Sequence, residues 1–92
     1  MQIQVQYFAQ VRQAAGRENE TVKLADGADV RALLAQLAER FGAAFRAFVL
    51  NENGDPRPGI IVLVNAQTVA RGEKKVLADG NRVSIFSPVA GG

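Results

Sequence analysis

The middle of the chain carries apolar residues at the spacing of an amphipathic helix. Between residues 29 and 42 they recur every three or four positions and form one stripe: Val30, Leu33, Leu34, Leu37, Ala38 and Phe41. Asp29 suits the N-cap, where its side chain accepts a first-turn N–H, and Gly42 suits the C′ position, where a left-handed glycine ends the helix. A chain of 92 residues needs nearly all its apolar area for one core. We therefore expect the stripe to pack on a sheet of the same domain.

Two strands are predicted before this helix. Residues 2–7 alternate strictly between apolar residues and glutamines, and Phe8 breaks the pattern because it falls on the glutamine face. An irregular connection through Gly16 leads to a second strand at residues 20–24. Two consecutive strands joined in this way predict an antiparallel hairpin.

Two more strands are predicted after the helix. Residues 60–64 form a continuous apolar run, which is typical of a strand buried on both faces, and residues 82–86 alternate. The connecting segments are an irregular stretch or short strand at 43–50, an exposed loop at 51–59, turns at 65–67 and 79–81, and a core plug formed by Val76 and Leu77. The fold class is α+β, with four to five strands and one main helix on one face. We expect one domain at 1–86 and a flexible C-terminal tail at 87–92.

The chain has no cysteine and no histidine, which excludes most catalytic side-chain chemistry. No spacing of metal ligands is present, so we expect no metal site and no bound cofactor. The net charge of +2 is spread over both halves of the chain, whereas a nucleic-acid footprint needs clustered basic residues. The reactive group must then be a carboxylate, a lysine, a hydroxyl or a chain terminus, and we expect no autonomous active site.

Nothing in the sequence predicts a targeting or membrane segment. The N-terminus has neither a basic region nor a long apolar stretch, and the longest aliphatic run is 60–64. We therefore expect no signal peptide and no membrane span, and a cytoplasmic protein.

The end of the chain is its most unusual feature. The last predicted strand leads directly into Pro88, which cannot continue a hydrogen-bond ladder, and then into residues of decreasing size: Val89, Ala90, Gly91 and Gly92. Fully extended, the six residues from Ser87 span roughly 20 Å. Gly91 and Gly92 have no side chains, so they could pass through a channel too narrow for other residues. The alternative is an ordinary frayed terminus, but the absence of other reactive groups favours a functional tail.

With this ending, the chain resembles the ubiquitin-like β-grasp sulfur carriers of the MoaD/ThiS type, most closely the small subunit of molybdopterin synthase. The resemblance covers nearly the full length. It rests on five segments: Tyr7-Phe8-Ala9-Gln10-Val11-Arg12, Val30-Arg31-Ala32-Leu33-Leu34, Val62-Leu63-Val64-Asn65, Leu77-Ala78-Asp79-Gly80-Asn81-Arg82-Val83 and Phe86-Ser87-Pro88-Val89-Ala90-Gly91-Gly92. The fold it implies is a ubiquitin-like β-grasp with a mixed sheet.

The resemblance also implies a chemistry for Gly92. An ATP-using partner of the ubiquitin-activating type (MoeB/ThiF-like) would adenylate its carboxylate, and a sulfur donor such as a cysteine desulfurase or rhodanese would convert it to a thiocarboxylate. The acceptor would be the MoaE-like large subunit of molybdopterin synthase, and the product the dithiolene of the molybdenum or tungsten cofactor. Relatives instead supply sulfur to thiamine thiazole, cysteine or other metabolites, or are conjugated to lysines as protein modifiers. Both alternatives remain open.

Such partners need a docking surface, which should be apolar and close to the tail. Phe8 and Phe86 both fall on the sheet face opposite the helix, and we predict that they form this surface. Val69 is a further candidate, and Arg12 is a candidate polar contact that orients the partner. The alternative for each phenylalanine is a minor core under a loop. The tail itself, from Pro88 to Gly92, is predicted to enter the partner's channel.

Overall fold

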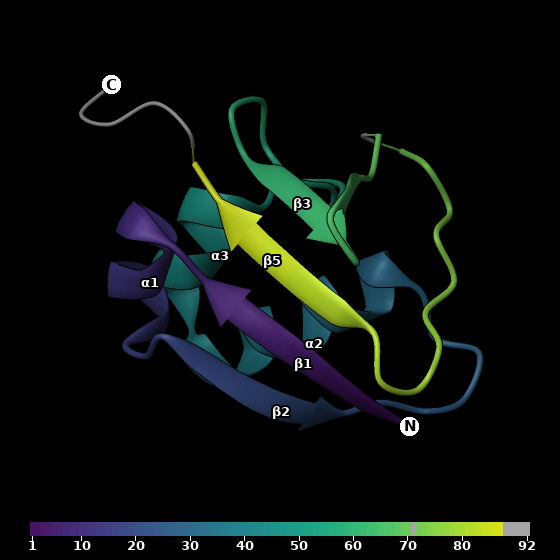
Figure 1. Cartoon of the computed structure of the whole chain (residues 1–92). Helices are drawn as coiled ribbons and strands as arrows, with labels where there is room; N and C mark the ends of the chain where they lie inside the picture. Colours follow the sequence, from purple (N-terminus) through teal and green to yellow (C-terminus); the bar gives the residue numbers. More distant parts are fainter. Residues whose placement is uncertain (71, 88–92) are drawn as a thin grey trace.

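A mixed five-stranded sheet carries its helices on one face (Figure 1). The computed structural model describes residues 1–70 and 72–87. In chain order the elements are β1 (Gln2–Tyr7), α1 (Ala9–Ala15), β2 (Asn19–Lys23), α2 (Val30–Phe41), α3 (Ala43–Val49), β3 (Ile61–Val64), β4 (Gln67–Thr68) and β5 (Arg82–Phe86). The α+β class, the β-grasp arrangement and the one long helix are confirmed.

The order of the strands brings the two ends of the chain together. The sheet runs β2-β1-β5-β3-β4, and β1 and β5 are parallel neighbours at its centre, whereas the other pairs are antiparallel. In the register of the parallel pair, Val5 lies opposite Val83 and Tyr7 opposite Ile85. The parallel strands β1 and β5 therefore end side by side at the same end of the sheet. We call this place, where the chain leaves β5, the root of the tail.

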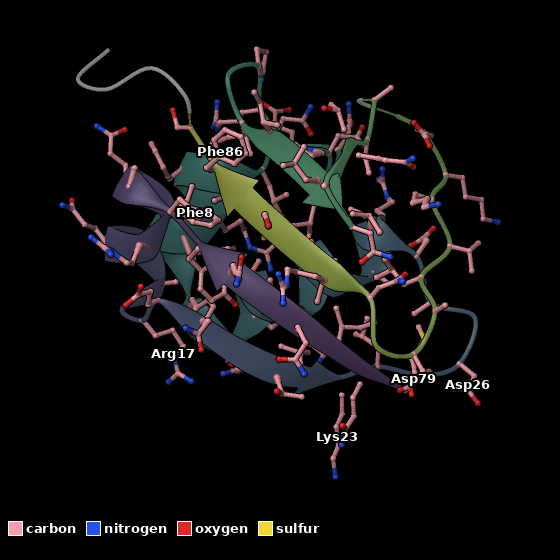
Figure 2. The ribbon with its side chains drawn as sticks, in the orientation of Figure 1. Phe8, Arg17, Lys23, Asp26, Asp79 and Phe86 are labelled. Carbon is pink, nitrogen blue, oxygen red and sulfur yellow. The ribbon has the colours of Figure 1, made fainter. Side chains whose placement is uncertain are left out.

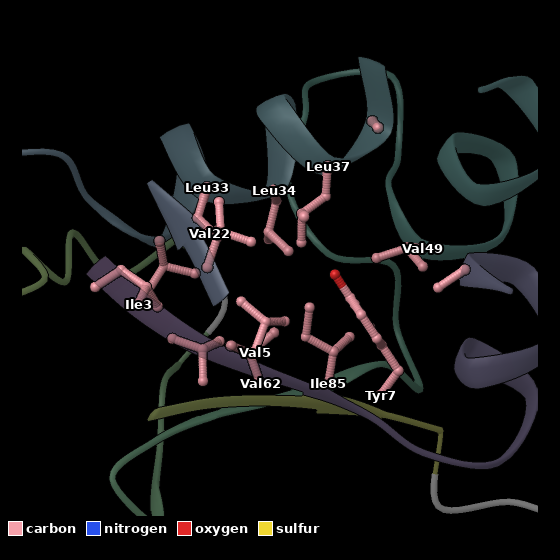
Figure 3. Packing of buried hydrophobic residues seen from close by; sticks show 14 of the residues in the cluster. Ile3, Val5, Tyr7, Val22, Leu33, Leu34, Leu37, Val49, Val62 and Ile85 are labelled. Carbon is pink, nitrogen blue, oxygen red and sulfur yellow. The ribbon is translucent and has the colours of Figure 1, made fainter. Parts of the chain in front are cut away.

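One core lies between the sheet and the helices (Figure 3). The inward residues of β1 are 0–1% exposed, as are Val83 and Ile85 of β5 and the three leucines of α2. The alternation in β1 and β5 thus sorts side chains as predicted. From α3, Phe45 and Val49 complete the core next to Tyr7, whose ring meets that of Phe45 edge-on at 6.4 Å between centroids.

The ends of α2 are largely as predicted. The side chain of Asp29 accepts a hydrogen bond from the backbone N–H of Ala32 at 2.9 Å, so the N-cap is confirmed. Gly42 ends the helix with φ +91°, but its ψ of −166° is extended rather than left-handed helical. The reason is that Gly42 is at once the C-cap of α2 and the N-cap of α3, and the chain must turn sharply between them.

Two segments predicted as irregular are helices. Residues 9–15 form α1, in which Val11 and Ala15, one turn apart, are buried; residues 43–49 form α3, in which Phe45 and Val49 have the same spacing. Each helix has only seven residues, and such short helices owe their stability to tertiary packing rather than to intrinsic propensity. The loop at 51–59 and the turns before β4 and β5 are confirmed.

Two predictions about burial are wrong in part. Only one face of β3 is fully buried, because no helix of residues 1–70 and 72–87 covers the other side of the sheet, where Ile61 and Leu63 remain half-exposed. Of the predicted core plug, Leu77 is 3% exposed but Val76 is 51% exposed. The pair lies in an extended segment, so adjacent side chains point in opposite directions.

Candidate functional site

The residues predicted to carry the chemistry lie beyond the described part of the chain. Pro88, Val89, Ala90, Gly91 and Gly92 are all outside it, and the description ends at Ser87. The site that can be built from the structure is therefore the surface around Ser87.

Phe8 and Phe86 meet at the root of the tail, on the sheet face opposite the helices (Figure 2). The parallel pairing of β1 and β5 places them side by side, and the backbone N–H of Phe8 donates to the carbonyl of Ile85 at 3.2 Å. Their rings are perpendicular, with centroids 6.1 Å apart. Phe8 is 45% exposed and Phe86 is half-buried, so the predicted placement of both residues is confirmed.

These two rings form one side of a shallow apolar hollow. Leu63 from β3 and Ser84 from β5 complete its lining, and its volume is about 320 Å³. We call these four residues the Phe8–Phe86 surface. Sequence reasoning missed Leu63 because the run 60–64 was interpreted as buried on both faces. The available signal was that residues 61 and 63 fall on the opposite face of the strand from residues 62 and 64.

The other two predicted contacts lie in different places. Arg12 is exposed on α1, and its backbone N–H donates to the carbonyl of Phe8 at 3.3 Å, so it follows Phe8 by one helical turn. Val69 packs instead against the core on the helix side of the sheet, where it lines a small cavity with Val30 and Leu34. The structure does not bring Val69 to the Phe8–Phe86 surface, and its contact with a partner stays a prediction.

A second hollow is lined in part by Ser87, the residue that follows Phe86. It is a groove of about 480 Å³ between α3 and the loop that precedes β3. Its lining residues are Ala47, Phe48, Arg57, Pro58, Gly59, Ile60 and Ser87, which we call the tail-root groove. No sequence motif marks this groove, because its walls come from segments whose packing is set only in the folded chain.

The described residues include no cluster suited to side-chain catalysis. No group of three or more acidic, histidine or cysteine residues within 1–70 and 72–87 could hold a metal ion. The pKa of Tyr7 is raised well above its usual range, first by burial and then by its hydrogen bond to Glu20, but this hydroxyl points into the helix side of the sheet. In the same part of the chain, no helix has the length and hydropathy needed to cross a membrane. The Phe8–Phe86 surface, by contrast, offers exposed apolar area to a partner.

Comparison with known proteins gives matches over the whole chain. The ThiS family model matches residues 5–92. Small archaeal modifier protein 3 of Haloferax volcanii is 37% identical, and the molybdopterin synthase sulfur carrier subunit of Chlamydomonas reinhardtii is 34% identical; both alignments cover 100% of each chain. The crystal structure of SAMP1 from Haloferax volcanii superposes with a TM-score of 0.86 at 26% identity, with 100% of both chains covered.

Proposed function

The chain belongs to the ThiS family, whose members are ubiquitin-like sulfur carriers and small modifiers. On this premise we propose that it carries sulfur as a thiocarboxylate on Gly92. The sulfur is delivered to the dithiolene of molybdopterin. The observation that carries the proposal is the juxtaposition at the end of β5. There, the last described residue of the tail emerges beside an exposed apolar surface, in a chain without cysteine or histidine. The full-length similarity to a molybdopterin synthase sulfur carrier subunit supports the choice of acceptor.

The proposed chemistry begins with activation, because a carboxylate has no good leaving group. An ATP-using partner transfers AMP to the Gly92 carboxylate and releases pyrophosphate. The terminal sulfur of a persulfide then displaces AMP, which gives an acyl disulfide. A thiol cleaves the S–S bond, so that the thiocarboxylate remains on Gly92 and the thiol becomes part of a disulfide. ATP is bound by the partner and not by this chain, and the expected cytoplasmic setting would supply it.

In this proposal the fold has two tasks. It fixes the start of the tail at the end of β5, and it presents the Phe8–Phe86 surface to the enzymes that bind the tail. Buried aromatic contacts near the centre of an interface commonly account for most of its binding energy. We therefore propose that Phe8 and Phe86 dock against the activating enzyme and, after sulfur loading, against a synthase large subunit, with Arg12 at the margin of the contact.

A second candidate function is that of a protein modifier. The 37% identity to a small archaeal modifier protein favours it. The activated Gly92 would then form an isopeptide bond with a lysine amine of another protein, and AMP would leave. Both functions need the same activation step, and they differ only in the nucleophile that attacks.

The deciding experiment measures the intact mass of the chain after incubation with ATP, a ubiquitin-activating-type adenylyltransferase and a sulfur donor. We expect a gain of about 16 Da from replacement of one oxygen by sulfur, lost when Gly91 and Gly92 are deleted. The deletion removes none of the described core residues, so we expect the unfolding midpoint to stay unchanged. Covalent adducts on other proteins, without the 16 Da gain, would favour the modifier. Equal sulfur transfer by the deleted chain would contradict both functions.

The role of the surface is tested with a matched pair of variants. Phe8 and Val76 are the two large hydrophobic residues that are exposed in the described chain, at 45% and 51%. We expect Phe8→Ala to raise the KM for activation about 10-fold or more, as truncation of an interface anchor does, and Val76→Ala to leave the KM unchanged. Equal effects of the two substitutions would show that exposed apolar area in general, rather than this surface, binds the partner.

A further inference from the structure

The tail-root groove has a preformed wall. The backbone N–H of Asn51 donates to the carbonyl of Asp55 at 2.8 Å, and the Asn51 side-chain oxygen accepts from the backbone N–H groups of Asn53 and Asp55. From α2, the guanidinium of Arg31 donates to the Asp55 carboxylate at 2.5 Å and to the carbonyl of Asn53. The loop is thus tied to itself and to a helix, and its second half forms the wall of the groove. A preformed site loses less conformational entropy when it binds.

Arg57 is the charged group of this groove. Its Nε donates to the carbonyl of Ala47 at 2.6 Å, and its backbone N–H donates to the carbonyl of Val49 at 2.8 Å. Both acceptors lie in the last turn of α3, so Arg57 is held against this helix, where it lines the groove. No ion pair of the described residues involves Arg57. Its two terminal nitrogens can therefore donate to a carboxylate, which an arginine fork binds with two parallel hydrogen bonds.

The remaining lining is uncharged and largely apolar. Phe48 and Ile60 are half-buried, with their inner parts packed against the core, and Ala47 and Pro58 lie exposed beside them. Arg57 is the only charged residue among the described lining residues. A ligand that fits has an apolar side chain next to a carboxylate, as in a protein segment that carries Asp or Glu beside an aliphatic or aromatic residue.

Ser87 connects the groove with the tail. It lines the groove, while the preceding residue, Phe86, belongs to the Phe8–Phe86 surface. Two hollows thus flank the point from which the tail leaves, one on the open sheet face and one between α3 and the loop. A protein that binds the tail at its root is brought against both.

We propose that the tail-root groove is a second docking site, which binds an acidic, apolar segment of the enzyme that activates Gly92. This inference rests on the proposed function. The activating enzyme is the occupant because metabolite sulfur transfer and protein modification both require it, whereas their acceptors differ. All the described lining residues belong to this chain, so the groove is present when the chain meets the activating enzyme, which is the first step of both functions.

The test measures ATP–pyrophosphate exchange by the adenylyltransferase as a function of the concentration of this chain. We expect Arg57→Gln to raise the KM about 10-fold at unchanged kcat, because the contact is made before and throughout the reaction. The matched control is Arg46→Gln, an exposed arginine of α3 that does not line the groove. The increase in KM should shrink at high salt, where charge pairs are screened.

A second pair of variants fills the groove without changing its charge. Ala47 lines the groove and Ala44 does not, although both are exposed on α3. Glutamine has a helix propensity close to that of alanine, so both substitutions should leave the fold intact, which thermal unfolding checks. We expect Ala47→Gln to raise the KM and Ala44→Gln to leave it unchanged. This pair keeps the test decisive if the loss of the Arg57 contacts to α3 destabilises the loop.

Several results would overturn the assignment. If the groove variants have the same KM as their controls, the activating enzyme does not bind the groove. Faster activation would indicate that this chain's own tail occupies it, and normal activation with impaired sulfur delivery from a ready-made thiocarboxylate would assign it to the acceptor. A concentration-dependent change in mass by sedimentation would indicate a second copy. If the unaltered chain is not activated at all, the proposed function fails as well.

Discussion

Replacing Tyr7 with phenylalanine removes one oxygen atom from a partly buried polar network. The Tyr7 side chain is 1% exposed, and its hydroxyl donates to Oε2 of Glu20 at 2.5 Å. The other oxygen of Glu20 accepts from Arg40 at 2.6 Å and from Arg17 at 3.3 Å. The variant keeps the aromatic ring and its edge-on contact with Phe41, whose centroid lies 5.7 Å away. The change in stability therefore reports the hydrogen bond.

The magnitude follows from the burial of the acceptor. The Glu20 side chain is only 8% exposed, so water cannot fully replace the lost donor. Hydrogen bonds to charged groups contribute about 1.5–3 kcal/mol, and the two arginines, which are 39% and 49% exposed, continue to neutralise the carboxylate. We expect a loss of about 2 kcal/mol in the free energy of unfolding. For a domain of this size the melting temperature would fall by about 8–16 °C.

Urea unfolding followed by circular dichroism measures this loss. The midpoint should decrease at constant m-value, which shows a change in stability rather than in compactness. The control is Thr21→Val, which removes an exposed hydrogen bond to Gln4 (3.2 Å) from a neighbouring position of the sheet. It should change stability by less than about 0.5 kcal/mol. A Tyr7→Phe loss as small as that of the control would refute the reasoning that burial of Glu20 makes this bond strong.

Two further predictions concern pH and backbone strain. The folded-state pKa of Tyr7 is raised, so near and above pH 10 the folded chain retains a proton that the unfolded chain releases; stability should fall as the pH rises, with a slope that approaches about 1.4 kcal/mol per pH unit above pH 10. Tyr7→Phe should lack this dependence, which urea unfolding between pH 9 and 11 measures, and an equal slope in both proteins would contradict the assignment. Gly42 has φ +91° and ψ −166°, a region almost confined to glycine, and nothing lies within 4 Å of a Cβ placed there. Gly42→Ala should therefore cost about 1–3 kcal/mol through backbone strain alone, and a loss below about 0.5 kcal/mol would argue against strained backbone at the junction of α2 and α3.

Local patterns predicted the elements that carry their own signals. The six alternating residues of β1, the twelve-residue helix α2 with its Asp29 cap, and the glycine turn before β5 each contain their periodicity and end signals within one segment. The helices α1 and α3 lack such signals: neither has a side chain that caps its N-terminus, and each buries only two residues. Their conformation depends on the core against which they pack.

The candidate site also contains residues that local patterns predict and residues that only the folded structure places. Alternation alone placed Phe8 and Phe86 on the open face of the sheet, which the structure confirms. Alternation could not show that Leu63 lines the same hollow as the two phenylalanines, because this depends on where β3 lies in the sheet. Nor could it show that Val69 lies away from that hollow, because this depends on the path of the segment after β4. The tail-root groove was not predicted at all, since its lining comes from α3, the following loop and Ser87.

The sequence by itself determined which side chains of β1, α2 and β5 face the core, where the main helix begins and ends, and that any covalent chemistry falls to a carboxylate, lysine, hydroxyl or terminus. The tertiary structure decided what surrounds the tail. Residues 8 and 86 become neighbours only because β1 and β5 pair in parallel at the centre of the sheet. Such pairing closes a loop of nearly the whole chain, and the burial of a shared core, rather than any local preference, stabilises it.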